Sequence, residues 1–171
     1  MKVLIASDIH GEMFYLNKLE DLIIKENPET IILLGDLLKY SFDENKNNVI
    51  DILNKYKEKI IAVRGNCDYQ TNDILYEFNI NSDYREIYLD NNKFILTHGH
   101  LNSWLIDIIK DNYVLQGHTH VYNLDGNYIN PGSVGLPRQN KEHTCIIYEN
   151  NELRLIDLDN YGTMQIRKLT K

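Results

Sequence analysis

The sequence has little cysteine, no long apolar run and a shortage of positive charge. It contains only two cysteines, Cys67 and Cys145, in 171 residues, which is too few for a disulfide framework and typical of a reducing compartment. No segment approaches the roughly 18 consecutive apolar residues that span a bilayer, and the apolar run before Asp8 is too short for a secretory signal. We therefore expect a cytoplasmic protein with no membrane partner.

The charge balance limits the classes of ligand that the protein is expected to bind. The chain has 18 Lys and Arg against 25 Asp and Glu, a formal net charge of -7. Binding to a polyphosphate backbone depends on neutralisation by Lys and Arg, so this balance disfavours nucleic acid as a ligand. A small anionic substrate remains compatible with it if a metal supplies positive charge locally. The ordinary composition predicts one globular domain over residues 1–171, and a homo-oligomer is left open.

The first third of the chain alternates strands and helices. Residues 2–7 and 30–34 are continuous apolar runs, which is the pattern of strands buried on both faces. Apolar residues at helical spacing predict helices over residues 12–26 and 49–57, and a strand over residues 59–63 follows. Such repeats predict parallel strands, whose carboxyl ends share the edge of the sheet where ligands bind.

The remainder of the chain is richer in turn signals. Residues 69–83 show no clear period, and residues 103–110 predict a short helix. Strand pairs around Asn-rich or Asp-Gly turns are expected at residues 85–89 with 93–97, 121–124 with 127–130, and 144–148 with 153–158. A parallel-leaning half followed by an antiparallel half predicts an α/β protein (α+β in some schemes) with two packed sheets and helices outside them.

Polar side chains beside a glycine follow several of the apolar segments. They occur in Asp8-Ile9-His10-Gly11, Gly35-Asp36, Gly65-Asn66-Cys67-Asp68, His98-Gly99-His100 and Gly117-His118-Thr119-His120. Asp, Asn and His supply the mixed oxygen and nitrogen ligands that Mn²⁺, Fe²⁺ and Zn²⁺ accept. Any one of these residues is as well explained as a turn or helix-cap residue. Their recurrence at successive strand ends favours a metal site.

The candidate ligands can be divided between two metal ions. One ion would take Asp8, His10 and His120, the other would take Asn66, His98 and His118, and Asp36 would bridge both. Two dications, two aspartates and a bridging hydroxide leave a net positive charge, which suits a phosphate ester in an otherwise acidic protein. Such a centre lowers the pKa of bound water and stabilises the charge that develops during in-line attack on phosphorus.

The ordered motifs resemble the calcineurin-like metallophosphoesterase superfamily, and most closely its small bacterial and archaeal phosphodiesterases. The resemblance covers residues 1 to about 138, since Asn130-Pro131-Gly132-Ser133 and Pro137-Arg138 are also similar to that subgroup. It implies a four-layer αββα sandwich of two mixed β-sheets flanked by helices. It also implies a dinuclear centre with the ligand division given above, commonly with Mn²⁺, and with Ni²⁺, Fe²⁺ or Zn²⁺ as alternatives. We interpret the segment from Asn130 to Ser133 as a tight turn that supports the metal-binding loops.

The resulting hypothesis is a dinuclear-metal phosphodiesterase in which a metal-bridging hydroxide attacks a small phosphodiester. A phosphomonoesterase or nucleotidase on the same centre is the nearest alternative. The superfamily also includes retromer's phosphoesterase-fold subunit, which is specialised for binding other proteins, so a catalytically weak scaffold is the rival from another class. The complete ligand set argues against a scaffold. A nuclease role is disfavoured by the acidic charge and by the lack of an added DNA-binding domain.

Two residues are candidates for protonating the leaving group. Cys67 stands where much of the superfamily has a histidine in that role, although the small subgroup often carries Gly-Asn-Cys-Asp. A thiol with an ordinary pKa of about 8.5 is mostly protonated at pH 7 and is a weak hydrogen-bond donor. His100 is the second candidate. A buried apolar role for Cys67 and a structural role for His100 remain open. Arg64 and Arg138 could contact phosphate, but we interpret each as a structural or surface arginine, and His143 as structural.

Overall fold

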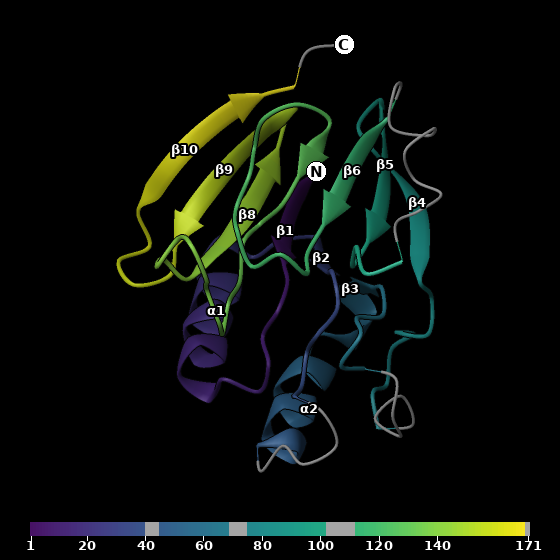
Figure 1. The fold of residues 1–171 in the computed structure, drawn as a ribbon, viewed down its shortest axis with the longest axis vertical. Helices are drawn as coiled ribbons and strands as arrows, with labels where there is room; N and C mark the ends of the chain where they lie inside the picture. The colour runs from purple at the N-terminus through teal and green to yellow at the C-terminus, as the bar shows by residue number, and fades with distance from the viewer. Residues whose placement is uncertain (40–44, 69–74, 102–111, 170–171) are drawn as a thin grey trace.

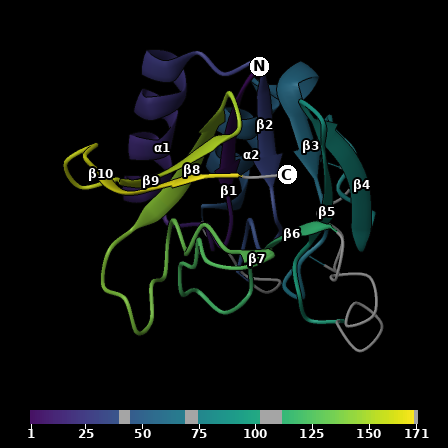
Figure 2. The same cartoon turned by 90° about the horizontal axis from the view of Figure 1, so that it is seen from above.

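Two mixed β-sheets face each other, and two helices cover the outer side of the larger sheet (Figures 1 and 2). The computed structural model describes residues 1–39, 45–68, 75–101 and 112–169. The six-stranded sheet has the spatial order β10 (Thr163–Lys168), β9 (Glu152–Asp157), β8 (Thr144–Glu149), β1 (Lys2–Ala6), β2 (Thr30–Leu33) and β3 (Ile60–Ala62). The four-stranded sheet has the order β4 (Tyr84–Leu89), β5 (Asn92–Thr97), β6 (Tyr113–Gln116) and β7 (Tyr128–Ile129).

The predicted fold class is confirmed by this arrangement. The helices are α1 (Met13–Glu26) and α2 (Lys46–Asn54), with a 3-10 turn at Lys57–Lys59. Helix α1 ends at Asn27, whose φ of 43° is left-handed, close to the predicted end. Helix α2 starts three residues before the expected Val49. The helix expected at residues 103–110 lies outside the described residues.

Strands β1 and β2 are buried on both faces, which explains their continuous apolar sequence. Strands β1, β2 and β3 are parallel, as the β-α repeats predict. Because side chains alternate along a strand, Leu4 and Ala6 pack in the core beneath the helices. Val3 and Ile5 pack in the second core, between the two sheets. Strand β1 is therefore covered by a layer on each side.

The second half of the chain does not form a separate antiparallel sheet, contrary to the expected division. Strand β8 pairs antiparallel with β1 and so joins the larger sheet, while β5, β6 and β7 run parallel to one another. The β4–β5 and β8–β9 hairpins are antiparallel, as predicted. Strand β10, which pairs with β9, was not anticipated from the sequence.

The strand expected at residues 121–124 is also absent from the described part of the chain. Asn123 makes only an isolated bridge to Asn130. Its side-chain amide donates to the carbonyl oxygens of Asp125 and Tyr128, at 3.0 and 2.6 Å. The Asn123 side chain therefore bonds carbonyl groups that backbone N–H groups would bond in a longer β-hairpin, and the segment forms a turn.

Candidate metal centre

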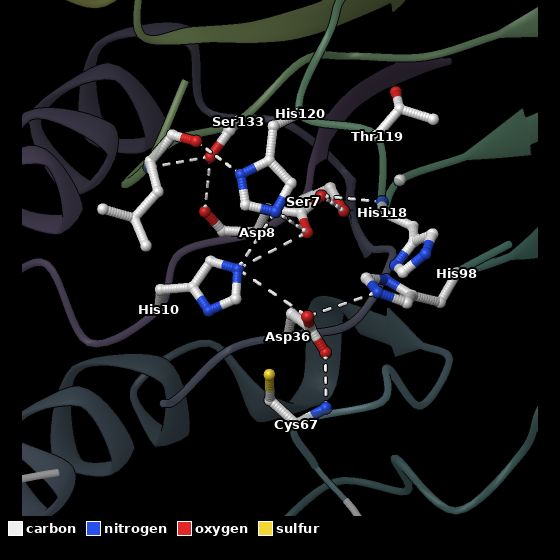
Figure 3. Close-up of polar contacts among 12 residues, drawn as sticks. Ser7, Asp8, His10, Asp36, Cys67, His98, His118, Thr119, His120 and Ser133 are labelled. Atoms are coloured by element: carbon white, nitrogen blue, oxygen red, sulfur yellow. Dashed lines mark hydrogen bonds and ion pairs between the residues drawn. The ribbon is translucent and has the colours of Figure 1, made fainter. Parts of the chain in front are cut away.

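The predicted ligands come together where strands of both sheets end (Figure 3). Asp8 follows β1 and Asp36 follows β2, while His98 follows β5 and His118 and His120 lie just beyond β6. A pocket of about 250 Å³ is lined by His10, Asp36, Lys39, Asn66, Cys67, His118, His120, Leu136 and Arg138. Residues that are more than 100 positions apart in the sequence thus face one cavity.

One group of ligands surrounds Asp8. His120 Nε2 lies 3.2 Å from Asp8 Oδ1, and His10 Nε2 lies 3.6 Å from the same oxygen. The two imidazole Nε2 atoms are 3.3 Å apart. The fully buried Oδ1 of Asp8 accepts no hydrogen bond from the described residues. These three donor atoms lie within 4.8 Å of one another, a spacing that fits a bound cation.

The other group surrounds His98. Its Nε2 atom lies 3.3 Å from Asp36 Oδ2 and 3.2 Å from Asn66 Oδ1. The His118 ring stands across it, with centroids 5.1 Å apart. His10 Nε2 lies 3.7 Å from Asp36 Oδ2, so Asp36 is in reach of both groups. The structure thus brings all seven predicted ligands together, and Asp36 lies at the junction.

The hydrogen bonds of two histidines fix which ring nitrogen faces the cavity. His98 Nδ1 lies 2.7 Å from the carbonyl oxygen of Leu34, and His120 Nδ1 contacts the carbonyl oxygen of Leu136. A carbonyl oxygen can only accept, so each Nδ1 carries the hydrogen. In a neutral ring, Nε2 then presents a lone pair toward a carboxylate oxygen. Two acceptors at this distance need a proton or a metal cation between them, and an Nδ1 bonded to a backbone carbonyl is typical of metal-bound imidazole.

Burial and these contacts shift the pKa values of the site. Burial alone favours the neutral form of Asp8 and Asp36, but the neighbouring histidines outweigh it and lower the pKa of both carboxyl groups. Burial lowers the pKa of His98 and His120, and their carboxylate partners reverse this and raise it. Burial and the nearby His98 lower the pKa of His118. The two aspartates are therefore ionised at neutral pH.

The backbone is strained at the ligands themselves. Left-handed φ angles of 50° to 66° occur at Asp8, His10, Asp36, His118 and His120. Non-glycine residues rarely adopt this conformation, which costs about 1 to 3 kcal/mol and concentrates at functional sites. Backbone hydrogen bonds hold the strained loops together, since His10 N–H donates to the Asp36 carbonyl at 3.0 Å and His118 N–H donates to the Asp8 carboxylate at 3.0 Å.

Two glycines let the loops approach closely. A Cβ atom on Gly65 would lie 2.1 Å from Asp36 Oδ1, and one on Gly117 would lie 2.0 Å from Ser7 Oγ. Ser7 in turn donates to Asp8 Oδ2 at 2.6 Å. Close packing against Asp36, and against Ser7 and Asp8, thus requires glycine at positions 65 and 117.

Asp68 is a positioning residue to which the sequence reasoning gave no role at the centre. Its carboxylate accepts from the backbone N–H groups of Asp36, Leu37 and Gly65, at 2.7, 3.1 and 2.8 Å. Burial and the nearby Asp36 charge raise the pKa of Asp68 to about 6. The available signal was an Asp in a glycine-containing loop, because Asp side chains commonly bond neighbouring backbone amides.

The turn from Asn130 to Ser133 supports the loops, as we interpreted it. The Asn130 amide donates to the Gly117 carbonyl at 2.9 Å and to Thr119 Oγ1 at 3.0 Å. Ser133 Oγ donates to the Asp8 carbonyl at 2.8 Å. This turn therefore ties the loop after β6 to the loop after β1.

The two candidate acids occupy different positions. Cys67 is buried and lines the pocket, and in Figure 3 its sulfur points toward the gap between His10 and Asp36. The His100 ring lies beside two of the ligands, with its centroid 5.4 Å from that of His98 and 6.3 Å from that of His118, and it is not among the residues that line this pocket. The geometry favours Cys67 for contact with a substrate, and the acid role of either residue stays a prediction.

The arginines differ from each other. Arg64 donates to Asp83 at 2.9 Å, which confirms a structural role. His143 is likewise structural, since its ring stacks on Tyr15 with centroids 3.3 Å apart. Arg138, which we interpreted in the same way, lines the metal pocket. Its place in the pocket gives it a position in the site that the sequence pattern did not indicate.

Comparison with known proteins identifies the family. The model of the calcineurin-like phosphoesterase superfamily domain matches residues 1–152. The chain belongs to the calcineurin-like phosphoesterase superfamily. Phosphodiesterase YfcE of Escherichia coli K12 is 30% identical over 171 aligned positions, which cover 93% of each chain. Phosphodiesterase MJ0936 of Methanocaldococcus jannaschii is 33% identical over 70% of this chain and 74% of its own length.

Solved structures of this superfamily agree with the fold. The E. coli phosphoesterase Yfce superposes with a TM-score of 0.88 at 28% identity and covers 99% of this chain and all of its own. Vps29 of Entamoeba histolytica superposes with a TM-score of 0.66 at 18% identity, over 99% of this chain and all of its own, which shows the shared fold alone. Metallophosphoesterases use divalent metal ions, and the donor set described above fits such ions.

No helix among the described residues has both the length and the apolar character needed to cross a membrane.

Proposed function

We propose that this protein is a metal-dependent phosphodiesterase that hydrolyses small phosphodiesters with two divalent ions, Mn²⁺ being the first choice. The observation that carries the proposal is the convergence of the Nε2 atoms of His98 and His120 on two buried, ionised carboxylates, Asp36 and Asp8. The names of the relatives in E. coli and M. jannaschii support a diester as substrate. The proposal includes a single catalytic domain and a cytoplasmic location.

The ligand division follows the two groups in the pocket. Asp8, His10 and His120 would hold one ion, Asn66, His98 and His118 the other, and Asp36, which lies within 3.7 Å of His10 and 3.3 Å of His98, would contact both. When bound, the ions supply a hydroxide nucleophile from water at neutral pH and neutralise charge on the phosphoryl oxygens.

The chain's own residues prepare the site for this chemistry. The carbonyl groups of Leu34 and Leu136 accept from Nδ1 of His98 and His120, so Nε2 is the ring nitrogen of each that faces the site and would bind a cation. Asp68 fixes the Asp36 backbone. The Cys67 thiol, on the wall of the pocket, would donate a proton toward the leaving oxygen. Arg138 adds positive charge at the pocket rim, which favours an anionic substrate.

Hydrolysis of matched chromogenic esters tests the proposal. Purified protein with Mn²⁺ is expected to hydrolyse bis(p-nitrophenyl) phosphate faster than p-nitrophenyl phosphate, and elemental analysis is expected to find two ions per chain. Asn66→Ala and His120→Ala should each lower kcat by at least about 100-fold, because each removes a metal ligand. His143→Gln is the matched control, since His143 packs on Tyr15 outside the pocket.

The outcomes separate the alternatives. A faster monoester reaction would make the protein a phosphomonoesterase on the same centre. Metal-free protein without activity, unchanged by either substitution, would refute the enzyme and leave a scaffold of the same fold.

A further inference from the structure

A second, larger cavity opens beside the metal pocket. Its volume is about 800 Å³, and it shares His118 and Arg138 with the metal pocket. A phosphoryl group needs little of that space, whereas cavities of roughly 300 to 1,000 Å³ take ligands of drug size. The larger cavity is therefore of a size to hold a substituent of the substrate.

The lining of the larger cavity has a distinct chemical character. Among the residues that the structure describes, none that lines it is a carboxylate, although the whole chain carries a net charge of -7. Gln116 and Gln139 contribute amide groups, Val121 and Ile129 contribute aliphatic surface, and Tyr128 contributes an aromatic ring. Such a wall suits an uncharged, flat ring with hydrogen-bonding edges, because the ring can stack on tyrosine while its edges meet amides.

Arg138 lies at the boundary of the two cavities. It is exposed and has no hydrogen bond or ion pair with the described part of the chain. A guanidinium group binds phosphate oxygens through two parallel N–H donors. A phosphate that contacts both the metal pocket and Arg138 has the larger cavity beside it, and a diester has a second ester arm to fill that space.

We propose that the 800 Å³ cavity is the subsite for the ester arm that stays on the phosphate after hydrolysis, and that it takes a neutral, hydrogen-bonding ring system of nucleoside type. This assignment rests on the proposed phosphodiesterase function and adds a substrate class to it. The ring face of Tyr128, a residue that is 37% exposed, is the stacking surface for that ring.

Three diesters that share one leaving group test the subsite. The p-nitrophenyl esters of thymidine 5′-phosphate, phenyl phosphate and methyl phosphate all release p-nitrophenolate when water adds to phosphorus, so only the retained arm differs. With Mn²⁺ present, kcat/KM is expected to be highest for the thymidine arm, intermediate for the phenyl arm and lowest for the methyl arm. Stacking on an aromatic side chain predicts a thymidine-to-methyl ratio of at least about 5.

Substitutions at Tyr128 assign the preference to this cavity. Tyr128→Ala is expected to lower the thymidine-to-methyl ratio about fivefold or more, whereas Tyr128→Phe, which keeps the ring, should preserve most of it. Tyr88→Ala is the matched control, because Tyr88 is an exposed tyrosine on the opposite edge strand of the same sheet. Its ratio should equal that of the parent protein.

The failures are distinguishable. If the parent protein with Mn²⁺ hydrolyses none of the three esters, the phosphodiesterase function falls and the subsite falls with it. If all three are hydrolysed with equal kcat/KM, or if Tyr128→Ala leaves the ratio unchanged, the subsite is refuted while the function stands. Equal values for the thymidine and phenyl arms would overturn the assignment of a hydrogen-bonding ring.

Discussion

Replacing Gly65 with alanine should damage the metal centre through a single methyl group. The added Cβ would lie 2.1 Å from Asp36 Oδ1 and 2.3 Å from Asp36 N, whereas ordinary contacts begin at 3.4 Å. The atoms it meets include backbone, so the loop after β2 must move by about 1 Å to accept it. The φ angle of Gly65 is not left-handed, so alanine fits the local conformation and the clash alone is tested.

The magnitude follows from the contacts that such a shift would break. Asp36 is held by Asp68 Oδ2, which accepts from Asp36 N–H at 2.7 Å, and by Cys67 N–H, which donates to Asp36 Oδ1 at 2.8 Å. Overpacking costs about 1 to 3 kcal/mol, and each lost hydrogen bond about 1 kcal/mol. We therefore expect Gly65→Ala to lower the free energy of unfolding by about 2 to 4 kcal/mol. Because Asp36 is the proposed bridge, kcat should fall about 100-fold.

Urea unfolding of the metal-free protein and ester hydrolysis with saturating Mn²⁺ measure the two effects. Gly126→Ala is the control. Its Cβ would meet nothing within 4 Å, although its φ of +64° makes alanine unfavourable there, by about 1 to 2 kcal/mol. The control should therefore lose some stability and keep its kcat. If Gly65→Ala kept both its stability and its kcat, the close contact between the two loops would be wrong.

Two further predictions concern Asp68 and pH. Asp68→Asn places an amide donor against at least one of the three N–H groups that donate to the Asp68 carboxylate, so titration calorimetry should show Mn²⁺ affinity reduced about 10- to 100-fold. The control Asp51→Asn, on the exposed face of α2, should bind Mn²⁺ as the parent protein does. Unchanged affinity in Asp68→Asn would contradict the positioning role. The pKa values of His98 and His120 are raised in the folded protein, so their protonated forms stabilise the metal-free fold. This contribution is complete when the pH is below the pKa of an unfolded histidine, near 6.5, and it is lost as the pH rises through the pKa values of the folded protein. Urea unfolding in EDTA should thus show lower stability at pH 8.5 than at pH 6, although the lowered pKa of His118 acts in the opposite direction. Higher stability at pH 8.5 would mean that the two histidine–carboxylate contacts do not outweigh the effect of His118.

The local sequence was enough to predict the ligand loops. Burial on both faces makes β1 and β2 continuous apolar runs, and the residue types that end them, Asp8 and Asp36, are the oxygen donors that metal ions prefer. The parallel order of β1, β2 and β3 also follows from the alternation of strands and helices. These features depend on neighbours in the chain, and so they can be read from short windows.

Pairing between distant strands could not be read in the same way. Strand β8 lies beside β1, and β6 lies beside β5 in parallel, although the turns between strands in the second half suggested an antiparallel sheet. The apolar pattern of a strand indicates which of its faces is buried, but it does not indicate which neighbouring strand it pairs with, because backbone hydrogen bonds are the same for every partner. The pairing of distant strands is decided by how side chains pack in the two hydrophobic cores.

The same distinction applies to the site. The sequence by itself determined the candidate ligands, because their chemistry is carried by residue type and spacing. Only the tertiary structure decided how their atoms face one another. It set the Nδ1 hydrogen bonds that orient His98 and His120, the hydrogen bonds from three backbone amides to Asp68, and the position of Arg138 between two cavities. These features depend on distances between segments that are remote in the chain, and such distances exist only once the two sheets have packed together.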